Sequence, residues 1–291
     1  MENSLDNDQG LRVVTKWLIA LSCICTISQG EIFAQLPHFN VVHTIDYELN
    51  YRSDTNSKVF KQAYFVLQAG TKQSRFYDKK LQIQDSIVKA VLMDFGNTES
   101  ASKAIAQKPA PHFKYIIDKN LLSGEVTFWE SFLLNGVIHY KDTFNTTLWQ
   151  IIGDTGRFGS FKTIKASCTF RGRKYSAWFV PEIPIQDGPY KFCGLPGLIV
   201  EVMDENNDYH FKMLSMAETS NQNLPLFHMY SQSKEVSRQR FLQQKSIFES
   251  NPLLGFTDLP NWVTVSEESK RAMMNIASER KKKNNNPIEL N

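Results

Sequence analysis

The chain has 291 residues, of which 42% are hydrophobic and 22% are charged. These values are ordinary for a globular protein, and a chain of this size needs neither a metal nor a disulfide to build its core. The formal net charge of +3 is too small to indicate a nucleic-acid partner. The length fits one large domain or two small ones.

The first 34 residues are predicted to be an export signal. Lys16 precedes an apolar run from Trp17 to Ile27, which has the length of a signal-peptide core and is too short to cross a membrane. Cleavage is expected between Ala34 and Gln35, and lipidation at Cys23 is the alternative. The mature chain contains no further apolar run of about 18 residues, so no transmembrane span is predicted in it. We therefore expect a periplasmic or outer-membrane-associated protein, or a secreted one.

The mature chain opens with strand patterns. Residues 41–51 alternate apolar and polar side chains, which is typical of a half-buried antiparallel strand. A second strand is predicted at 59–68, and a short third one begins at 74. A helical insertion is expected over 85–107, because alanines and polar residues replace the alternation there and Pro109 ends it.

Strand patterns resume after the insertion and dominate as far as residue 216. Asn135-Gly136 predicts a tight hairpin turn, because both residues tolerate positive φ. Gly153, Gly156 and Gly159 predict a loop. The further predicted strands are 113–117, 125–132, 137–144, 148–152, 162–170, 174–180, 198–203 and 209–213.

Proline and glycine punctuate the region between the last two predicted hairpins. Two prolines within Pro181–Ile185 exclude a central strand and indicate an edge or a connector, because proline lacks the amide hydrogen. The stretch from Gly188 to Val202 follows, dense in glycine and proline before it becomes an alternating strand. No other stretch is so constrained by its composition.

The C-terminal part changes in character after residue 216. Residues 234–249 and 266–283 are predicted surface helices, and the second has acidic residues at its start and four basic residues at its end, which suits the helix dipole. The predicted organisation is a β-rich core over 35–216 and a helical extension over 217–291. The fold class is mainly β, as a curved antiparallel sheet or an open barrel or sandwich.

Several motifs carry a family resemblance. The hexapeptide Gly194-Leu-Pro-Gly-Leu-Ile199 resembles the signature of the GLPGLI family, exported proteins of Bacteroidetes. The resemblance extends to Phe170–Trp178, Pro181–Ile185, Gly188–Phe192 and the tail Asn286-Pro-Ile-Glu289. It implies no enzymatic activity and no catalytic residue. It implies accessory work beside outer-membrane receptors or glycan-active enzymes.

The motif stretch has two interpretations. Gly194 and Gly197 permit positive φ or close backbone approach, and Pro196 stiffens the loop. With Tyr190 and Phe192, these residues form either a rigid rim that binds a ligand or a tight corner that feeds the next strand into the sheet. We favour the corner.

Two further groups are candidate sites. Arg171 and Arg173 form a basic turn that would bind an acidic sugar or a phosphate, although we favour a solvated hairpin turn as their explanation. Cys168 and Cys193 are the only cysteines of the mature chain, and either a disulfide or buried free thiols fits them. A carboxylate pair for glycoside hydrolysis, Glu182 and Asp187, has little support in this proline-rich context.

No catalytic residue, metal site or cofactor is predicted. The histidines lack metal-ligand spacing, and no nucleophile elbow or phosphate loop occurs. We expect a non-catalytic binding or accessory protein of the cell envelope, with a lipid, a glycan or an outer-membrane receptor as its partner. A hydrolase acting on glycans or peptides is the alternative.

Overall fold

One large open sheet forms the body of the protein. The computed structural model describes residues 38–93, 110–132, 136–144, 149–219, 227, 230, 233–256 and 266–290. The twelve strands follow the order β12-β6-β5-β4-β3-β2-β1-β11-β10-β9-β8-β7. All neighbours are antiparallel except β12 and β6, which are parallel. The predicted signal (1–34), the end of the predicted insertion (94–107) and Asn135 lie outside the described residues.

The mainly β prediction is confirmed, as a sheet that stays open. The strands are β1 (His43–Tyr51), β2 (Lys61–Ala69), β3 (Gln73–Asp78), β4 (Tyr115–Asn120), β5 (Glu125–Ser131), β6 (Val137–Thr143), β7 (Gln150–Phe158), β8 (Phe161–Phe170), β9 (Arg173–Val180), β10 (Leu198–Asp204), β11 (Tyr209–Glu218) and β12 (Lys234–Glu235). Most were predicted to within a few residues, because their apolar side chains alternate.

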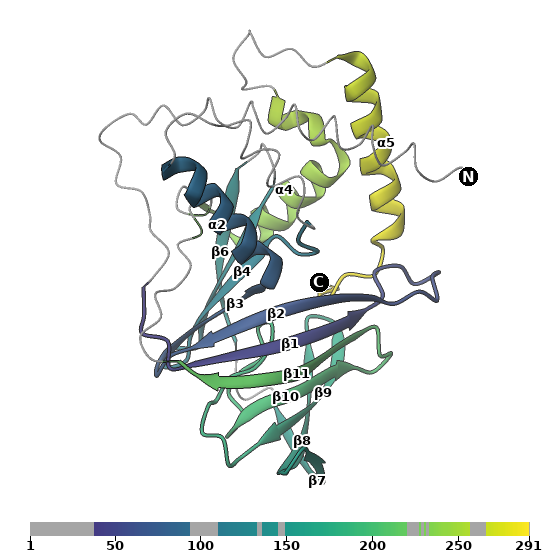
Figure 1. Ribbon diagram of the computed structural model, residues 1–291. Coiled ribbons are helices and arrows are strands. Elements are labelled where there is room, and N and C mark those ends of the chain that lie inside the picture. Colours follow the sequence, from purple (N-terminus) through teal and green to yellow (C-terminus); the bar gives the residue numbers. More distant parts are fainter. Residues whose placement is uncertain are drawn as a thin grey trace, which may run out of the picture.

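Burial differs between the two halves of the sheet. In β1 only alternate residues are buried, among them Ile45, Tyr47 and Leu49, as the alternation predicts. In β2 and β3 both faces are buried over most of their length. The second face is covered because Val66 and Tyr77 pack with Leu81 of the helix α2 (Lys79–Met93) in a small separate core. Figure 1 shows α2 lying over this half of the sheet.

The sheet is strongly curved, and the connection from β9 to β10 crosses its concave face. Four strands separate β4 from β10 in the sheet order. Nevertheless Lys119 of β4 bonds to Gly188, and Tyr115 of β4 contacts the ring of Tyr190. The main core lies in this concavity. Its aromatic side chains include Phe65, Phe76, Phe128, Tyr140, Phe170, Phe192 and Phe211.

Helix α2 begins six residues earlier than the predicted insertion. Asp78 ends β3, and its carboxylate accepts a hydrogen bond from the backbone N–H of Lys80 at 2.9 Å. The same carboxylate accepts a bond from the backbone N–H of His112, so it joins the helix start to the segment that re-enters the sheet. An aspartate before a run of helix formers is an N-cap signal, and the prediction missed it.

Two C-terminal helices were predicted and are present. They are α4 (Arg238–Ser250), followed by a short 3-10 turn η4 (Pro252–Phe256), and α5 (Glu267–Lys283). Ser237 and Ser266 cap their N-termini. Phe241 of α4 is buried against the rings of Phe128 and Tyr140, which fixes α4 to the sheet. Residues 234–235, expected to start the first helix, form β12 instead.

One prediction about the sheet edge is wrong. The glycines at 153 and 156 do not end a strand, because β7 runs through them with a register shift between Ile151 and Thr155. Pro181–Ile185 was predicted to be an edge or a connector, and it is the connector between β9 and β10, since the sheet ends at β7 and β12. Edge strand β7 is largely exposed and carries the exposed side chains of Ile151 and Ile152.

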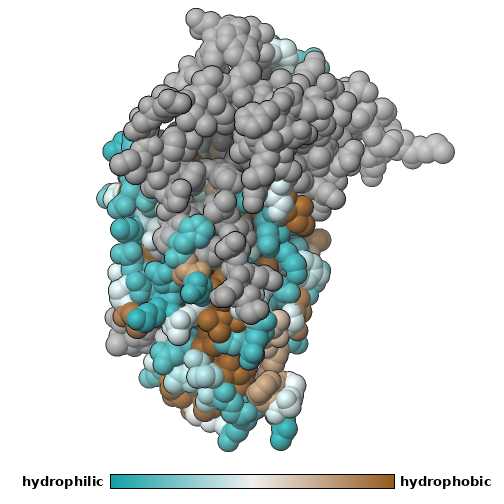
Figure 2. Space-filling view, turned by 60° about the vertical axis from the view of Figure 1, so that its left-hand side comes forward, coloured by the Kyte–Doolittle hydropathy of each residue, from teal (hydrophilic) through white to brown (hydrophobic). Residues whose placement is uncertain are grey.

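No helix of the described part of the chain combines the length and the apolar character that a membrane crossing needs. Figure 2 shows hydrophobic side chains scattered between hydrophilic ones on the face turned to the viewer.

Candidate functional site

The motif stretch forms a compact corner that fills the concave face. We call residues 187–197 the corner. Tyr190 has a φ of 54°, Gly194 of 86° and Gly197 of 151°, so the chain reverses within a few residues. A Cβ on Gly197 would lie 2.2 Å from the carbonyl oxygen of Val180, which only glycine avoids. Ile199 N–H then donates to the carbonyl of Asp187 at 2.9 Å, which closes the corner at its base.

Two lysines are buried by this corner, and each is neutralised differently. The first is Lys119, whose side chain is 1% exposed. It pairs with the fully buried carboxylate of Asp187 and donates to the carbonyl of Gly188 at 2.7 Å. Asp187 Oδ1 also accepts the N–H of Gly188 at 2.8 Å. The pair therefore joins β4 to the corner.

The second lysine, Lys191, is paired with a residue near the end of the chain. Its side chain is also 1% exposed, and Nζ lies 2.5 Å from Oε1 of Glu289. It donates in addition to the hydroxyl of Tyr140 at 2.7 Å and lies 3.6 Å from Asp142. The rings of Phe128, Tyr140 and Tyr190 surround the ammonium group at 5.0 to 5.6 Å. Lys191 thus sits in an aromatic cage that one carboxylate closes.

Glu289 uses both of its oxygens in this site. Oε1 accepts the hydroxyl of Tyr190 at 2.7 Å as well as Lys191, and Oε2 accepts Nη2 of Arg238 from α4 at 2.8 Å. Burial by itself would raise the pKa of Glu289, but Lys191, Arg238 and Tyr190 outweigh it and lower that pKa to about 2. The group is therefore a carboxylate at neutral pH.

The rest of this segment is held through its backbone. We call residues 286–290 the terminal segment. Arg173 donates to the carbonyl of Pro287 from Nε at 3.1 Å and from Nη2 at 2.8 Å. Tyr209 donates to the carbonyl of Asn286 at 2.5 Å, and Tyr175 to that of Ile288 at 2.8 Å. Side chains of β9 and β11 thus donate hydrogen bonds to three consecutive carbonyls.

Both ends of the terminal segment are also fixed to the sheet. The N–H of Asn286 donates to the carbonyl of Ser53 at 3.0 Å, and that of Leu290 to the carbonyl of Arg171 at 2.8 Å. The side chain of Asn286 accepts a short hydrogen bond from Arg173 and donates to the carbonyl of Arg52 at 2.7 Å. Figure 1 shows this yellow segment returning from α5 to the end of the sheet beside β2. The segment therefore lies between the β1–β2 loop and the β8–β9 turn. We call the surface that binds it, formed by Arg52, Ser53, Arg171, Arg173, Tyr175 and Tyr209, the groove.

The structure separates the predicted site residues. Tyr190 and Phe192 are buried, and Phe192 packs among aromatic rings of the core, so neither forms an open rim. Pro196 is exposed, whereas Gly194 and Gly197 shape the corner. The predicted basic turn is not solvated as a unit, because Arg173 is buried and pairs with Asp204 at 2.9 Å.

Arg171 has a different role from Arg173. It adopts a φ of 46° and donates to both oxygens of Asp142, at 2.8 and 2.7 Å. Asp142 in turn lies beside Lys191. Arg171 therefore contacts the aromatic cage only through Asp142, while its backbone carbonyl accepts the N–H of Leu290.

The predicted reactive groups do not assemble into catalytic machinery. Cys168 and Cys193 are free buried thiols, and burial raises the pKa of each to about 12. They are therefore protonated and weakly nucleophilic. Asp187 is sequestered by Lys119, while Glu182 is exposed. Among the described residues, no group of three or more His, Cys, Asp or Glu side chains is arranged to hold a metal.

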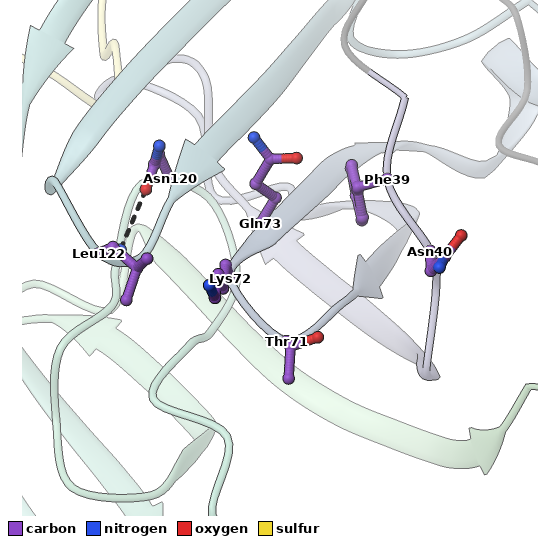
Figure 3. Close-up of a pocket in the computed structure, with 7 residues that line it drawn as sticks. All are labelled: Phe39, Asn40, Thr71, Lys72, Gln73, Asn120 and Leu122. Carbon is purple, nitrogen blue, oxygen red and sulfur yellow. Dashed lines mark hydrogen bonds between the residues drawn. The ribbon is translucent and has the colours of Figure 1, made fainter.

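A separate surface hollow has a volume of about 370 Å³. It lies at the β2–β3 and β4–β5 turns and is lined by Phe39, Asn40, Thr71, Lys72, Gln73, Asn120 and Leu122 (Figure 3). The Asn120 side chain already accepts the N–H of Leu122 at 3.1 Å, as the dashed line in Figure 3 marks. Lys72 is the only titratable side chain in the lining, so the hollow offers no acid–base pair.

Sequence reasoning missed Lys119, Lys191 and Glu289. The resemblance marked the regions of Lys191 and Glu289, but nothing local in the sequence pairs two residues 98 positions apart. A single lysine between two aromatic residues in an otherwise apolar stretch was the available signal, since such a charge needs a partner once buried.

Comparisons with known proteins say little about the function of this chain. The family model described as "Protein of unknown function (Porph_ging)" matches residues 165–201, which include β9 and the corner. No curated protein matches the chain.

Two solved structures of PNGF-II show a loose likeness. The first, in space group P21, is 12% identical with a TM-score of 0.47, over 70% of this chain and 32% of that one. The second, in space group C2, is 13% identical with a TM-score of 0.48, over 72% of this chain and 33% of that one. The chain spans about a third of the length of these PNGF-II chains.

Proposed function

We propose that the chain is an exported, non-catalytic binding protein of the cell envelope that belongs to the GLPGLI family and recognises a polypeptide partner. One observation carries the proposal. The groove beside the corner holds a short peptide, the terminal segment, which bends at Ile288, through three backbone carbonyls and one carboxylate. Backbone carbonyls are present in a peptide of any sequence, and the carboxylate adds a requirement on the sequence.

The other expected ligands have less support. An apolar ligand carrier needs an open cavity lined by aromatic side chains, but the concave face is filled by packed rings such as the Phe65–Phe76 stack. A glycan platform needs exposed aromatic faces, whereas Trp129 is buried and Trp149 and Trp178 pack partly against the core. A polypeptide partner, such as an outer-membrane receptor, fits the groove better.

The test removes the terminal segment from the groove only after the full-length chain has folded, so the shortened chain does not have to fold by itself. A specific protease site is inserted after Asn284, which is exposed, and the folded chain is cut there. After the released fragment is removed by dialysis, a labelled peptide with the sequence of residues 286–290 is titrated in and followed by fluorescence anisotropy. We expect saturable binding.

The matched control is a peptide with glutamine in place of Glu289, which we expect to bind at least about tenfold more weakly because Lys191 then lacks its carboxylate. Chain variant Lys72→Met, in the separate hollow, should bind as the parent does. A cut chain that stays folded by circular dichroism and binds neither peptide would refute the proposed function.

A further inference from the structure

We infer that the terminal segment is a resident ligand, and that the groove exchanges it for a short acidic segment of the partner polypeptide. This inference rests on the proposed function and adds the chemistry of the partner. It also gives residues 286–290 a regulatory role, as the occupant that a partner must replace.

The empty groove is unfavourable, and this favours replacement of the segment over its simple release. Lys191 is 1% exposed and surrounded by three aromatic rings. When Glu289 leaves, the nearest remaining carboxylate is Asp142 at 3.6 Å, and Arg171 already engages both of its oxygens. A buried ammonium without a full partner is strongly unfavourable. The groove is therefore much more stable with a carboxylate in it than without one.

The contacts define what a replacement must present. Arg173, Tyr175 and Tyr209 donate to carbonyls, which a chain of any sequence offers when it bends as this segment does. The groove recognises the side chain of the segment at two positions. Asn286 bonds to Arg173 and to the Arg52 carbonyl, and Glu289 closes the cage. The side chain of Ile288 packs against the main core. The partner segment thus carries an amide, then an aliphatic residue two positions later, then a carboxylate.

The path to the terminal segment is suited to displacement. Ala277 is the one buried residue among those described in α5, and this helix packs mainly on α4 and η4. Residues 281–285 are exposed, so the groove is approached along a solvated stretch. Lys283 and Asn285 also bond to Ser53, Asp54 and Thr55 of the β1–β2 loop, but these bonds are exposed or only partly buried. The buried contacts belong to residues 286–290, and a partner has to compete mainly with these.

The experiment uses the intact, uncut chain. The labelled peptide of residues 286–290 is titrated into the parent chain and into the variant Glu289→Gln, with amide hydrogen exchange of Leu290 as a second readout. The variant's own segment is the weaker competitor, so we expect it to bind the peptide at least about tenfold more tightly than the parent. Peptide binding should also remove the protection of the Leu290 amide, since its bond to Arg171 is lost.

Two controls make the outcomes distinct. Lys191→Met should abolish the preference for the carboxylate peptide over its glutamine form while the chain stays folded. Equal peptide affinity in the parent and Glu289→Gln chains, or an unchanged Leu290 amide on binding, would overturn the exchange. If the cut chain binds the peptide while the intact chains do not exchange, the proposed function stands and this inference falls. If no form binds, both fall.

Discussion

The two lysines that the corner buries are equally exposed, but their partners come from different parts of the chain. Lys119 is neutralised by Asp187, which belongs to the corner itself and is fixed by the N–H of Gly188. Lys191 is neutralised by Glu289, which arrives from the far end of the sequence. The first pair connects two parts of the sheet core. The second connects the core to a segment that lies on its surface groove.

This difference indicates which charge is structural and which one is available for recognition. Asp187 cannot leave Lys119 without unfolding the corner, because its backbone also bonds to Ile199. Glu289 can leave Lys191 when only residues 286–290 detach. Of the two buried pairs, the one that Glu289 closes is therefore the one that the proposed exchange uses.

The largest effect is expected at the structural pair. Lys119→Met leaves the carboxylate of Asp187 fully buried without its cation, and the free energy of unfolding should fall by about 3–5 kcal/mol. Urea denaturation followed by fluorescence measures this. The double variant Lys119→Met, Asp187→Asn removes both charges and should recover at least part of the loss. Similar losses in the single and double variants would contradict this account of Lys119.

Glu289→Gln should cost less than Lys119→Met. Lys191 keeps the hydroxyl of Tyr140 and a distant Asp142, so we expect a loss of about 3 kcal/mol in the same assay. Glu279→Gln, in the exposed face of α5, is the matched control and should change stability little. If Glu289→Gln were neutral, the terminal segment would not be stabilised by its charge.

Acidification tests the same pair without mutation. The pKa of Glu289 is lowered from 4.5 to about 2 in the folded chain, so its stabilisation is complete above about pH 5 and is lost as the pH falls towards 2. At pH 3 the loss should be about 2 kcal/mol. The stability difference between the parent and Glu289→Gln should therefore shrink between pH 6 and pH 3. A constant difference would show that Glu289 is not the titrating group.

Tyr190→Phe should have the smallest effect. It removes one of the three donors to Glu289 while the ring stays in the core, and we expect about 1 kcal/mol. The same variant should bind the labelled peptide slightly more weakly once the chain is cut. A loss above about 3 kcal/mol would mean that Tyr190, with its φ of 54°, acts mainly through the shape of the corner.

The sheet could be predicted because its signals are local. Alternation in β1 and the capping serine before α5 each reflect physics within a few residues, and both appear as expected. The error at β7 has a physical reason as well. Its glycines are accommodated in an exposed edge strand, where a register shift costs little.

The candidate site could not be predicted in the same way. The composition of the corner correctly indicated a constrained turn, and Gly197 shows why glycine is required there. The pairing of Lys119, Lys191 and Glu289 depends on the curvature of the sheet, which brings β4, β6 and the terminal segment to one place. A pattern within one strand carries no information about that curvature.

The distance in sequence between Lys191 and Glu289 has a consequence for how the chain is made. Lys191 is synthesised 98 residues before the carboxylate that neutralises it, while Asp187 follows Lys119 after a shorter interval. Contacts of such long range slow folding, because a large loop must close first. A nascent chain that has passed the corner therefore holds an incomplete cage. Until Glu289 follows, the ammonium of Lys191 stays hydrated, because burying it without its carboxylate is unfavourable.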